Sequence, residues 1–143
     1  MDEYEKQDPR QKNKRWLEIG GKTHFYKSKW ESNYAFMLEW LKQRGEIIDW
    51  FYEPDKFWFD KIKSGVTNYT PDFKVIHKKP VKYPDGRISE IEYVEVKGYM
   101  DAKSATKINR MRIYHKHILL RVVDHNWFKE QKKKLKGLIP GWE

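Results

Sequence analysis

Apolar residues recur at helical spacing in the segment SKWESNYAFMLEWLKQRG, residues 28–45. They fall on one helix face and are Trp30, Tyr34, Met37, Leu38 and Leu41. Ser28 is a favourable N-cap residue, and Gly45 stands where a helix would end. The pattern therefore predicts a helix over residues 28–45. Residues 1–27 are polar and basic, and we interpret them as an N-terminal arm ahead of a domain that spans residues 28–143.

Short runs rich in β-branched and aromatic residues follow this helix. The runs IIDWFYEP, KFWFDKI and NYTPDFKVI, residues 47–54, 56–62 and 68–76, predict a meander of strands. The polar segment KKPVKYPDGR, residues 78–87, is predicted to be a loop with Asp85-Gly86 as its turn. The next strand is SEIEYVEVKG, residues 89–98. We expect the strands on either side of the loop to pair antiparallel.

The last third of the chain predicts helix, strand and helix. DAKSATKINRMRIYHK, residues 101–116, starts at Asp101, a suitable N-cap. HILLRVV, residues 117–123, is nearly continuous in apolar residues and is typical of a strand buried on both faces. NWFKEQKKKLKGL, residues 126–138, predicts a short basic helix capped by Asn126. This order indicates an α/β fold in which a mixed sheet is flanked by helices.

Composition narrows the class of protein. A chain of 143 residues without repeats is the size of one domain, and it contains no cysteine. No apolar run approaches a membrane span, and the start does not resemble a signal peptide, so we expect a cytoplasmic protein without a membrane partner. The net charge of +9 favours a polyanionic partner such as DNA. Much of this excess lies in RQKNKR and KEQKKKLK, residues 10–15 and 129–136, so solvated basic tails are the alternative.

Two acids and a lysine interrupt the apolar strands. Alternation along residues 89–98 places Glu95 and Lys97 on one face and two valines on the other. If the strand of Asp72 pairs with that of Glu95, their carboxylates can meet over one cation, and hard oxygen ligands suit Mg²⁺. A neighbouring lysine can stabilise charge that develops on a phosphate. The alternative is an ordinary ion pair on a solvated sheet face, but Pro71 before Asp72 and Gly98 after Lys97 have backbone roles that such a face does not require.

The sequences YTPDF and EVKG, preceded by a helix that contains SKWE, resemble the PD-(D/E)xK motif of restriction-endonuclease-like nucleases. The likeness spans residues 28–124 and is to phage junction-resolving enzymes of the endonuclease I type, related small phage nucleases and the DNA-cleaving subunit of heteromeric transposases. The resemblance implies an αβββαβ core, a nuclease domain over residues 28–143, and Mg²⁺, replaceable by Mn²⁺, as cofactor. It implies Asp72 and Glu95 as metal ligands with the Val96 carbonyl as a third, Glu31 as a ligand or water-positioning acid, and Lys97 as electrostatic catalyst.

Glu31 has a second interpretation, because Ser28 and Glu31 have the spacing of a capping box. A row formed by Glu31, Ala35 and Leu38 nevertheless places this acid at the border of the apolar face. Several basic residues are candidate DNA contacts: Lys78, Lys79, Lys82 and Arg87 in the long loop, and Lys107 on the second predicted helix. For the loop, a solvated segment without a partner is the alternative.

The resemblance makes a Mg²⁺-dependent DNA endonuclease the leading hypothesis. By that likeness it would be a homodimer that acts on branched DNA such as Holliday junctions during DNA recombination, in the host cytoplasm if the chain is phage-encoded. One alternative is an endonuclease that cuts or nicks duplex DNA, as transposase partners do. The other is a DNA-binding module without catalysis.

Overall fold

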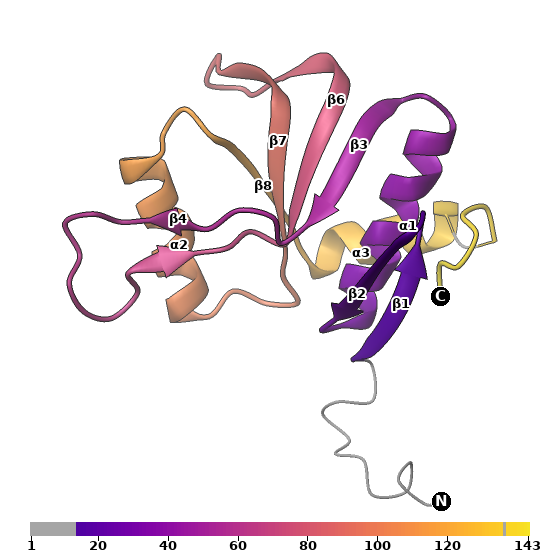
Figure 1. Ribbon diagram of the computed structural model, residues 1–143, viewed down its shortest axis with the longest axis horizontal. Helices are drawn as coiled ribbons and strands as arrows, with labels where there is room; N and C mark the ends of the chain where they lie inside the picture. Colours follow the sequence, from indigo (N-terminus) through magenta and orange to yellow (C-terminus); the bar gives the residue numbers. More distant parts are fainter. Residues whose placement is uncertain (1–13, 136) are drawn as a thin grey trace, which may run out of the picture.

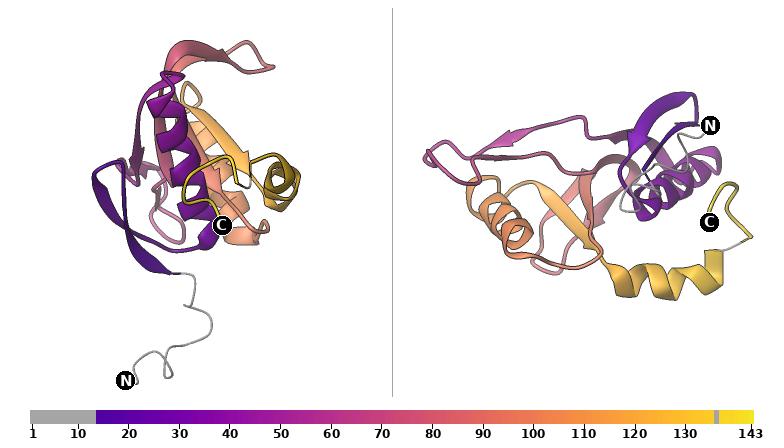
Figure 2. Two further views of the ribbon diagram at one scale, coloured as in Figure 1. Left: turned by 90° about the vertical axis from the view of Figure 1, so that its right-hand side faces the viewer. Right: turned by 90° about the horizontal axis from the view of Figure 1, so that it is seen from below.

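The computed structural model describes residues 14–135 and 137–143, so most of the basic stretch at residues 10–15 lies outside the described part (Figures 1 and 2). The elements in chain order are β1 (Arg15–Ile19), β2 (Lys22–Tyr26), α1 (Lys29–Gln43), β3 (Ile47–Tyr52), β4 (Phe57–Trp58), β5 (Asn68–Tyr69), β6 (Phe73–Lys82), β7 (Ile88–Val96), α2 (Ala102–Tyr114), β8 (Leu119–Val123) and α3 (His125–Leu135). In these described ranges, no helix is long and apolar enough to cross a membrane.

The central sheet contains β3, β6, β7 and β8 in that order (Figure 1). β6 runs antiparallel to β3 and β7, as predicted for the β6–β7 pair, whereas β8 runs parallel to β7. The prediction of a mixed α/β sheet with flanking helices is confirmed. These strand directions place the end of β3, the start of β6 and the ends of β7 and β8 at the same end of the sheet.

α1 forms where its apolar stripe predicts. The Ser28 hydroxyl accepts a hydrogen bond from the Glu31 N–H (3.1 Å), and Gly45 has the left-handed φ of 75° that ends many helices. Its buried face packs on the sheet in a cluster that includes Ala35, Leu38, Trp50, Phe73, Val75 and Val94. This core fixes the first turn of α1 against the ends of the strands.

A second cluster lies at the other end of the molecule (Figure 2). It contains Phe59, Tyr69 and Met111, from the β4–β5 segment and α2. β4 and β5 pair with each other and are separate from the central sheet. The predicted meander is therefore wrong for residues 56–62, because only two of these residues form a strand and their partner is β5.

Part of the predicted N-terminal arm is a β-hairpin. β1 and β2 pair antiparallel around Gly20 and Gly21, whose φ angles of 60° and 80° suit the tight turn between two strands. Ile19 and Tyr26, at the ends of the two strands, are 3% and 0% exposed and belong to the core cluster. The hairpin thus contributes to the core beside α1.

Three predicted details are wrong. Residues 78–82 belong to β6, which continues through a register irregularity between Ile76 and Val81, so the predicted loop shrinks to the turn at residues 83–87. β8 is an edge strand in which only Leu119 and Val123 are buried, so it is not enclosed on both faces. The side chain of Asp124, not Asn126, accepts the first-turn hydrogen bond of α3, from the Trp127 N–H at 3.0 Å.

Candidate active site

Three acids from distant parts of the chain gather at the end of the sheet where β3 and β7 finish and β6 begins. Glu31 lies in the first turn of α1, Asp72 directly precedes β6, and Glu95 lies near the end of β7. Phe73 pairs with Val94 across β6 and β7, so the next position along both strands brings Asp72 opposite Glu95. The three acids are 8%, 9% and 8% exposed. The pairing of β6 with β7, which the predicted approach of Asp72 to Glu95 required, is therefore present.

Asp72 is fixed by hydrogen bonds to the strands on either side. Its Oδ2 accepts a hydrogen bond from the Val96 N–H at 2.7 Å, at the end of β7. Its main-chain carbonyl accepts from the Glu53 N–H at 2.8 Å, just after β3. Pro71, which is fully buried, restricts the backbone immediately before it. The carboxylate consequently has one oxygen held by the backbone and Oδ1 as its other acceptor.

Glu31 points toward the sheet. Its Oε1 accepts a hydrogen bond from the Tyr52 hydroxyl at 2.5 Å, and its Oε2 lies 3.3 Å from the Ser28 hydroxyl. The helix cap is made by the Ser28 hydroxyl and the Glu31 backbone N–H. Since these contacts leave the carboxylate bound to Tyr52 on β3, capping alone does not account for its position.

Glu95 lies between a tyrosine and the predicted catalytic lysine. Its Oε1 accepts from the Tyr69 hydroxyl at 2.5 Å, and its Oε2 is 3.8 Å from Lys97 Nζ. The Lys97 backbone N–H donates to the Val123 carbonyl at 2.9 Å, which joins the residue after β7 to the end of β8. Gly98 follows without a side chain, and a Cβ there would lie 3.3 Å from the Trp30 ring. The backbone of this loop therefore runs close to α1.

The carboxylates repel one another in a buried setting. Burial raises the pKa of Asp72 well above its ordinary value, and the charges of Glu95 and Glu31 raise it further, against the Val96 N–H. Burial also raises the pKa of Glu95, opposed by Tyr69 and Lys97. For Glu31, burial raises the pKa and the Tyr52 hydrogen bond lowers it. Such clustered and perturbed carboxyls are typical of functional sites.

The oxygen donors suit a hydrated Mg²⁺ ion. Mg²⁺ is usually held by one or two carboxylates and keeps several waters. Asp72 and Glu95 each have one oxygen beyond those bound by Val96 and Tyr69, and both of these are hard ligands. Within residues 14–135 and 137–143, no group of three or more acidic, histidine or cysteine side chains is arranged to hold a metal ion. The two remaining oxygens are the donors that this pair offers to a cation.

The predicted DNA-contacting residues divide into two groups. Lys107 lies near the acids, because its Nζ is 6.0 Å from the Tyr69 ring and its charge lowers the pKa of Glu95. The others are Lys78, Lys79, Lys82 and Arg87, at the opposite end of β6 and at the start of β7 (Figure 1). Nine residues of strand, about 30 Å, separate Phe73 from Lys82. The structure does not bring this group to the acids.

Arg87 has intramolecular partners. Its guanidinium donates to the carbonyls of Lys116 (2.8 Å) and Ile118 (3.1 Å), and it pairs with Asp85 at 2.8 Å. These bonds hold the β6–β7 turn against the segment before β8. Lys78, Lys79 and Lys82 are exposed.

Sequence reasoning missed four residues near the acids: Lys27, Tyr52, Glu53 and Tyr69. A signal was present for Tyr52, because period-two alternation in β3 places it on the same face as the fully buried Trp50. For Tyr69 no local signal distinguishes a core aromatic residue from a carboxylate partner. Lys27 adjoins the predicted helix and Glu53 lies near the end of the run at residues 47–54, but neither has a pattern that marks it as a partner of the acids.

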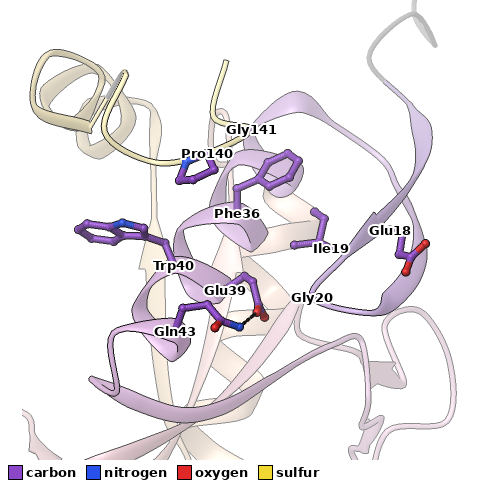
Figure 3. Close-up of a pocket in the computed structure, with 9 residues that line it drawn as sticks. All are labelled: Glu18, Ile19, Gly20, Phe36, Glu39, Trp40, Gln43, Pro140 and Gly141. Carbon is purple, nitrogen blue, oxygen red and sulfur yellow. Dashed lines mark hydrogen bonds between the residues drawn. The ribbon is translucent and has the colours of Figure 1, made fainter.

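A separate apolar cavity of about 410 Å³ lies between the β1–β2 turn, α1 and the C-terminal turn (Figure 3). Ile19, Phe36, Trp40 and Pro140 give it apolar walls. Glu39 enters it, but its carboxylate accepts hydrogen bonds from Gln43 (2.6 Å) and the Trp50 indole (2.9 Å). The residues that line this cavity include none of the predicted site residues, so its volume does not mark the chemistry.

Comparison with protein-family models finds no family that matches this chain, and comparison with curated proteins finds no matching relative. The functional interpretation therefore rests on the residues and geometry of the chain and on the motif resemblance carried by YTPDF, EVKG and SKWE.

Proposed function

We propose that this protein is a Mg²⁺-dependent endodeoxyribonuclease of the PD-(D/E)xK class, with Glu31, Asp72, Glu95 and Lys97 as its active site. The observation that carries the proposal is that Asp72, directly before β6, and Glu95, on β7, are buried opposite each other, each with one oxygen held by a separate hydrogen bond, and with Lys97 beside Glu95. Glu31 adds a third buried acid from α1. The order α1, β3, β6, β7, α2, β8 supports a restriction-endonuclease-like αβββαβ core.

The reaction would be hydrolysis of a phosphodiester bond. A water oxygen forms a bond to phosphorus, one P–O ester bond breaks, and the leaving oxygen receives a proton. Asp72 and Glu95, with the Val96 carbonyl, would hold Mg²⁺ or Mn²⁺, which when bound supplies Lewis-acid stabilisation of the phosphate charge. Lys97 adds a fixed positive charge toward the developing oxyanion.

Glu31 and the tyrosines have supporting roles in this proposal. Glu31, held by Tyr52, is placed to orient the attacking water and accept its proton. Burial raises the pKa values of Tyr52 and Tyr69, and the charges of Glu31 and Glu95 respectively raise them further. Both phenols therefore remain protonated donors, and each keeps one oxygen of its carboxylate partner in a fixed direction.

Branched DNA is the proposed substrate, and a homodimer is the proposed form. The net charge of +9 supports a polyanionic partner. Preference for junctions and dimerisation follow from the resemblance to junction-resolving enzymes, since two strands must be cut. The duplex-cutting and non-catalytic alternatives make different predictions for the same substrates.

The test is cleavage of matched four-way junction, flap, duplex and single-stranded DNA with Mg²⁺, beside Asp72→Asn and a metal-free control. We expect Mg²⁺-dependent cleavage that is fastest on the junction and absent in Asp72→Asn. A preference for the junction of less than a few-fold over duplex would reject junction resolution and retain the nuclease. Binding of all four substrates without cleavage would instead favour the non-catalytic module.

A further inference from the structure

Lys27 and Glu53 form an ion pair at the edge of the acid cluster. Lys27 Nζ is 2.9 Å from Glu53 Oε2, and the two side chains are 57% and 28% exposed. Lys27 lies just after β2 and Glu53 just after β3, so two separate chain segments meet here. The ammonium group has three donors, and this bond uses one of them.

The backbone of Glu53 is unusual. Its φ of 49° makes it the one described residue other than glycine with positive φ. That conformation is unfavourable for a residue with a Cβ, and it is most often retained at functional positions. The Glu53 N–H donates to the Asp72 carbonyl at 2.8 Å. In this conformation the backbone of Glu53 is hydrogen-bonded to the backbone of Asp72, one of the two paired acids.

An exposed ion pair alone is a weak reason to retain this conformation. The ion pair instead holds the ammonium group of Lys27 on the side of the acid cluster that is nearest β3. Lys97 occupies the other side, after β7 and next to β8, and strand order therefore separates the two lysines across the site. The hydrogen bond to Glu53 raises the pKa of Lys27 against the effect of burial, and the charges of Glu53, Glu31 and Asp72 raise it further, so Lys27 stays protonated.

A phosphate that approaches these acids meets strong repulsion unless positive charge surrounds them. Glu31, Asp72 and Glu95 are all buried at the same end of the sheet. Lys97 lies next to Glu95. The proposed metal would offset the charges of Asp72 and Glu95, but a DNA strand that crosses this end of the sheet also passes Glu31 and, without metal, meets the charge of Asp72. Lys27 is an exposed lysine on this side of the acids: it pairs with Glu53, whose N–H donates to the Asp72 carbonyl, and it directly precedes Ser28, the N-cap of the helix that carries Glu31.

We propose that Lys27, held by Glu53, binds a backbone phosphate of the DNA beside Glu31 and Asp72, on the side of the site opposite Lys97. This inference rests on the proposed function and adds a substrate-binding residue to it. Glu53 is a positioning residue, because it acts through Lys27. The partner is a nucleic-acid phosphate, and the contact carries no sequence preference.

The test is equilibrium binding of the junction DNA without divalent metal, in an Asp72→Asn parent that cannot cut. Lys27→Ala is compared with Lys27→Arg and with Lys42→Ala, whose lysine also has an acidic partner, Asp49 at 3.1 Å, but lies in the last turn of α1. Each lost phosphate contact lowers the slope of log K against log salt by about 0.9. Between about 50 and about 200 mM salt, the parent should therefore lose about 3.5-fold more affinity than Lys27→Ala.

The expected result is a lower slope for Lys27→Ala and the parent's slope for both Lys27→Arg and Lys42→Ala. Thermal melts of each variant establish that the fold is intact. An unchanged slope for Lys27→Ala, or an equal reduction in Lys42→Ala, would overturn the assignment while the parent still binds DNA. If the parent itself does not bind DNA, the proposed nuclease function fails first, and the two failures are thereby distinguished.

Discussion

Asp72→Asn should stabilise the metal-free protein, although it replaces a buried, hydrogen-bonded residue. Asp72 is 9% exposed and lies opposite Glu95, and the charges of Glu95 and Glu31 both oppose its ionisation. An amide has the same shape and no charge. Its oxygen still accepts the hydrogen bond that the Val96 N–H donates to Asp72 at 2.7 Å. The substitution therefore removes repulsion and keeps the packing.

The size of the gain can be worked out from the strand geometry. Directly opposite side chains on paired strands place two carboxylates about 5 to 7 Å apart, and at an effective dielectric constant of about 20 their repulsion is about 2 to 3 kcal/mol. Loss of the charge on the acceptor of the Val96 N–H costs about 1 kcal/mol. We expect a net increase of about 1 to 2 kcal/mol in the free energy of unfolding at neutral pH. For a chain of this length, that raises Tm by about 3 to 8 °C.

The gain should depend on pH in a fixed direction. Because the pKa of Asp72 is higher in the folded protein than in the unfolded chain, the folded state binds more protons between those two pKa values. The stability that this group contributes to the wild type is therefore fully present below its pKa in the unfolded chain, which is about 4. It is lost as pH rises through the folded pKa. The advantage of Asp72→Asn should accordingly appear at neutral pH and vanish in acid.

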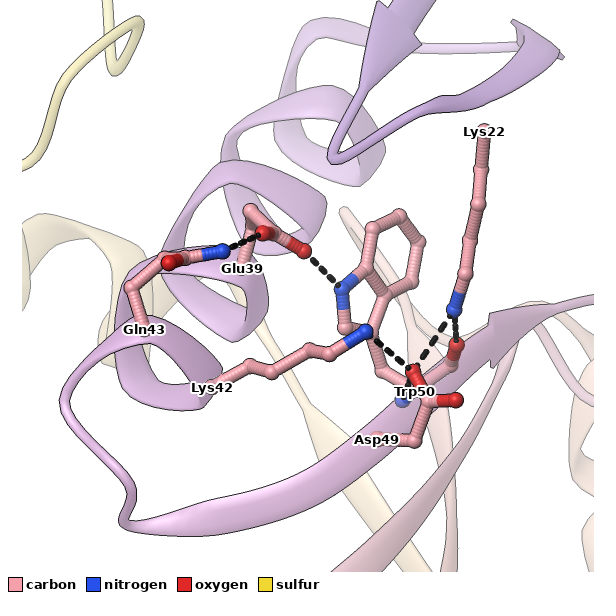
Figure 4. Close-up of polar contacts among 6 residues, drawn as sticks. All are labelled: Lys22, Glu39, Lys42, Gln43, Asp49 and Trp50. Carbon is pink, nitrogen blue, oxygen red and sulfur yellow. Dashed lines mark hydrogen bonds and ion pairs between the residues drawn. The ribbon is translucent and has the colours of Figure 1, made fainter.

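Asp49→Asn is the matched control (Figure 4). Burial alone would raise the pKa of Asp49, but hydrogen bonds from Lys22 (2.8 Å), the Trp50 N–H (2.8 Å) and Lys42 (3.1 Å) lower it to about 2. Its folded-state ionisation is stabilising above the unfolded pKa and is lost as pH falls toward 2. This variant should lose about 1 to 2 kcal/mol at neutral pH. Two aspartates on neighbouring strands thus have opposite expected signs.

The measurement is urea and thermal unfolding of both variants in chelator, from acid to neutral pH, and then with Mg²⁺. Saturating Mg²⁺ should raise the Tm of the wild type and leave that of Asp72→Asn nearly unchanged, because a ligand stabilises the state that binds it. Destabilisation by Asp72→Asn at neutral pH, of the size seen for Asp49→Asn, would refute the description of Asp72 as a repelled carboxylate.

Local patterns were sufficient to predict α1, α2 and the β6–β7 pair. Ser28 and Asp101 cap their helices as expected, because a cap depends on residues within one turn. The approach of Asp72 to Glu95 was also predictable, since antiparallel pairing fixes which residues stand opposite. These predictions use contacts that are short in sequence or that a single hairpin determines.

The missed features depend on tertiary packing. Arg15 and Lys22 lie on the same face of the β1–β2 hairpin as Ile19 and Tyr26, and their charge concealed the alternation that buries these two residues. Gly20-Gly21 between the two strands was the available signal. β8 is apolar enough for a central strand, and only the sheet order shows that it is an edge. The left-handed φ of Glu53 has no sequence signature, because this conformation is set by the Asp72 strand beside it.

Three further tests separate the roles of the site residues. Lys97→Ala should keep DNA binding and lower the single-turnover cleavage rate by roughly 10² to 10³, the usual effect of losing one preorganised donor; a loss of less than about tenfold would remove it from catalysis. Glu31→Gln should melt no lower than the wild type, because the cap is the bond from the Glu31 N–H to the Ser28 hydroxyl and the amide keeps an oxygen that accepts from Tyr52, yet it should cleave poorly; near-wild-type cleavage would exclude Glu31 from the site. The last test compares two tyrosines whose rings lie 4.7 Å apart, Tyr52 and Tyr26. The Tyr52 hydroxyl donates to Glu31 at 2.5 Å and lowers its pKa against the effect of burial, whereas the buried Tyr26 hydroxyl has no hydrogen-bond partner in the described part of the chain. Tyr52→Phe should therefore move the acid limb of the pH–rate profile to higher pH, because Glu31 then needs a higher pH to ionise. Tyr26→Phe removes a hydroxyl that makes no bond, so it should leave the limb in place and cost no stability. Equal profiles for the two variants would mean that the Tyr52 hydrogen bond does not control the ionisation of Glu31 during the reaction.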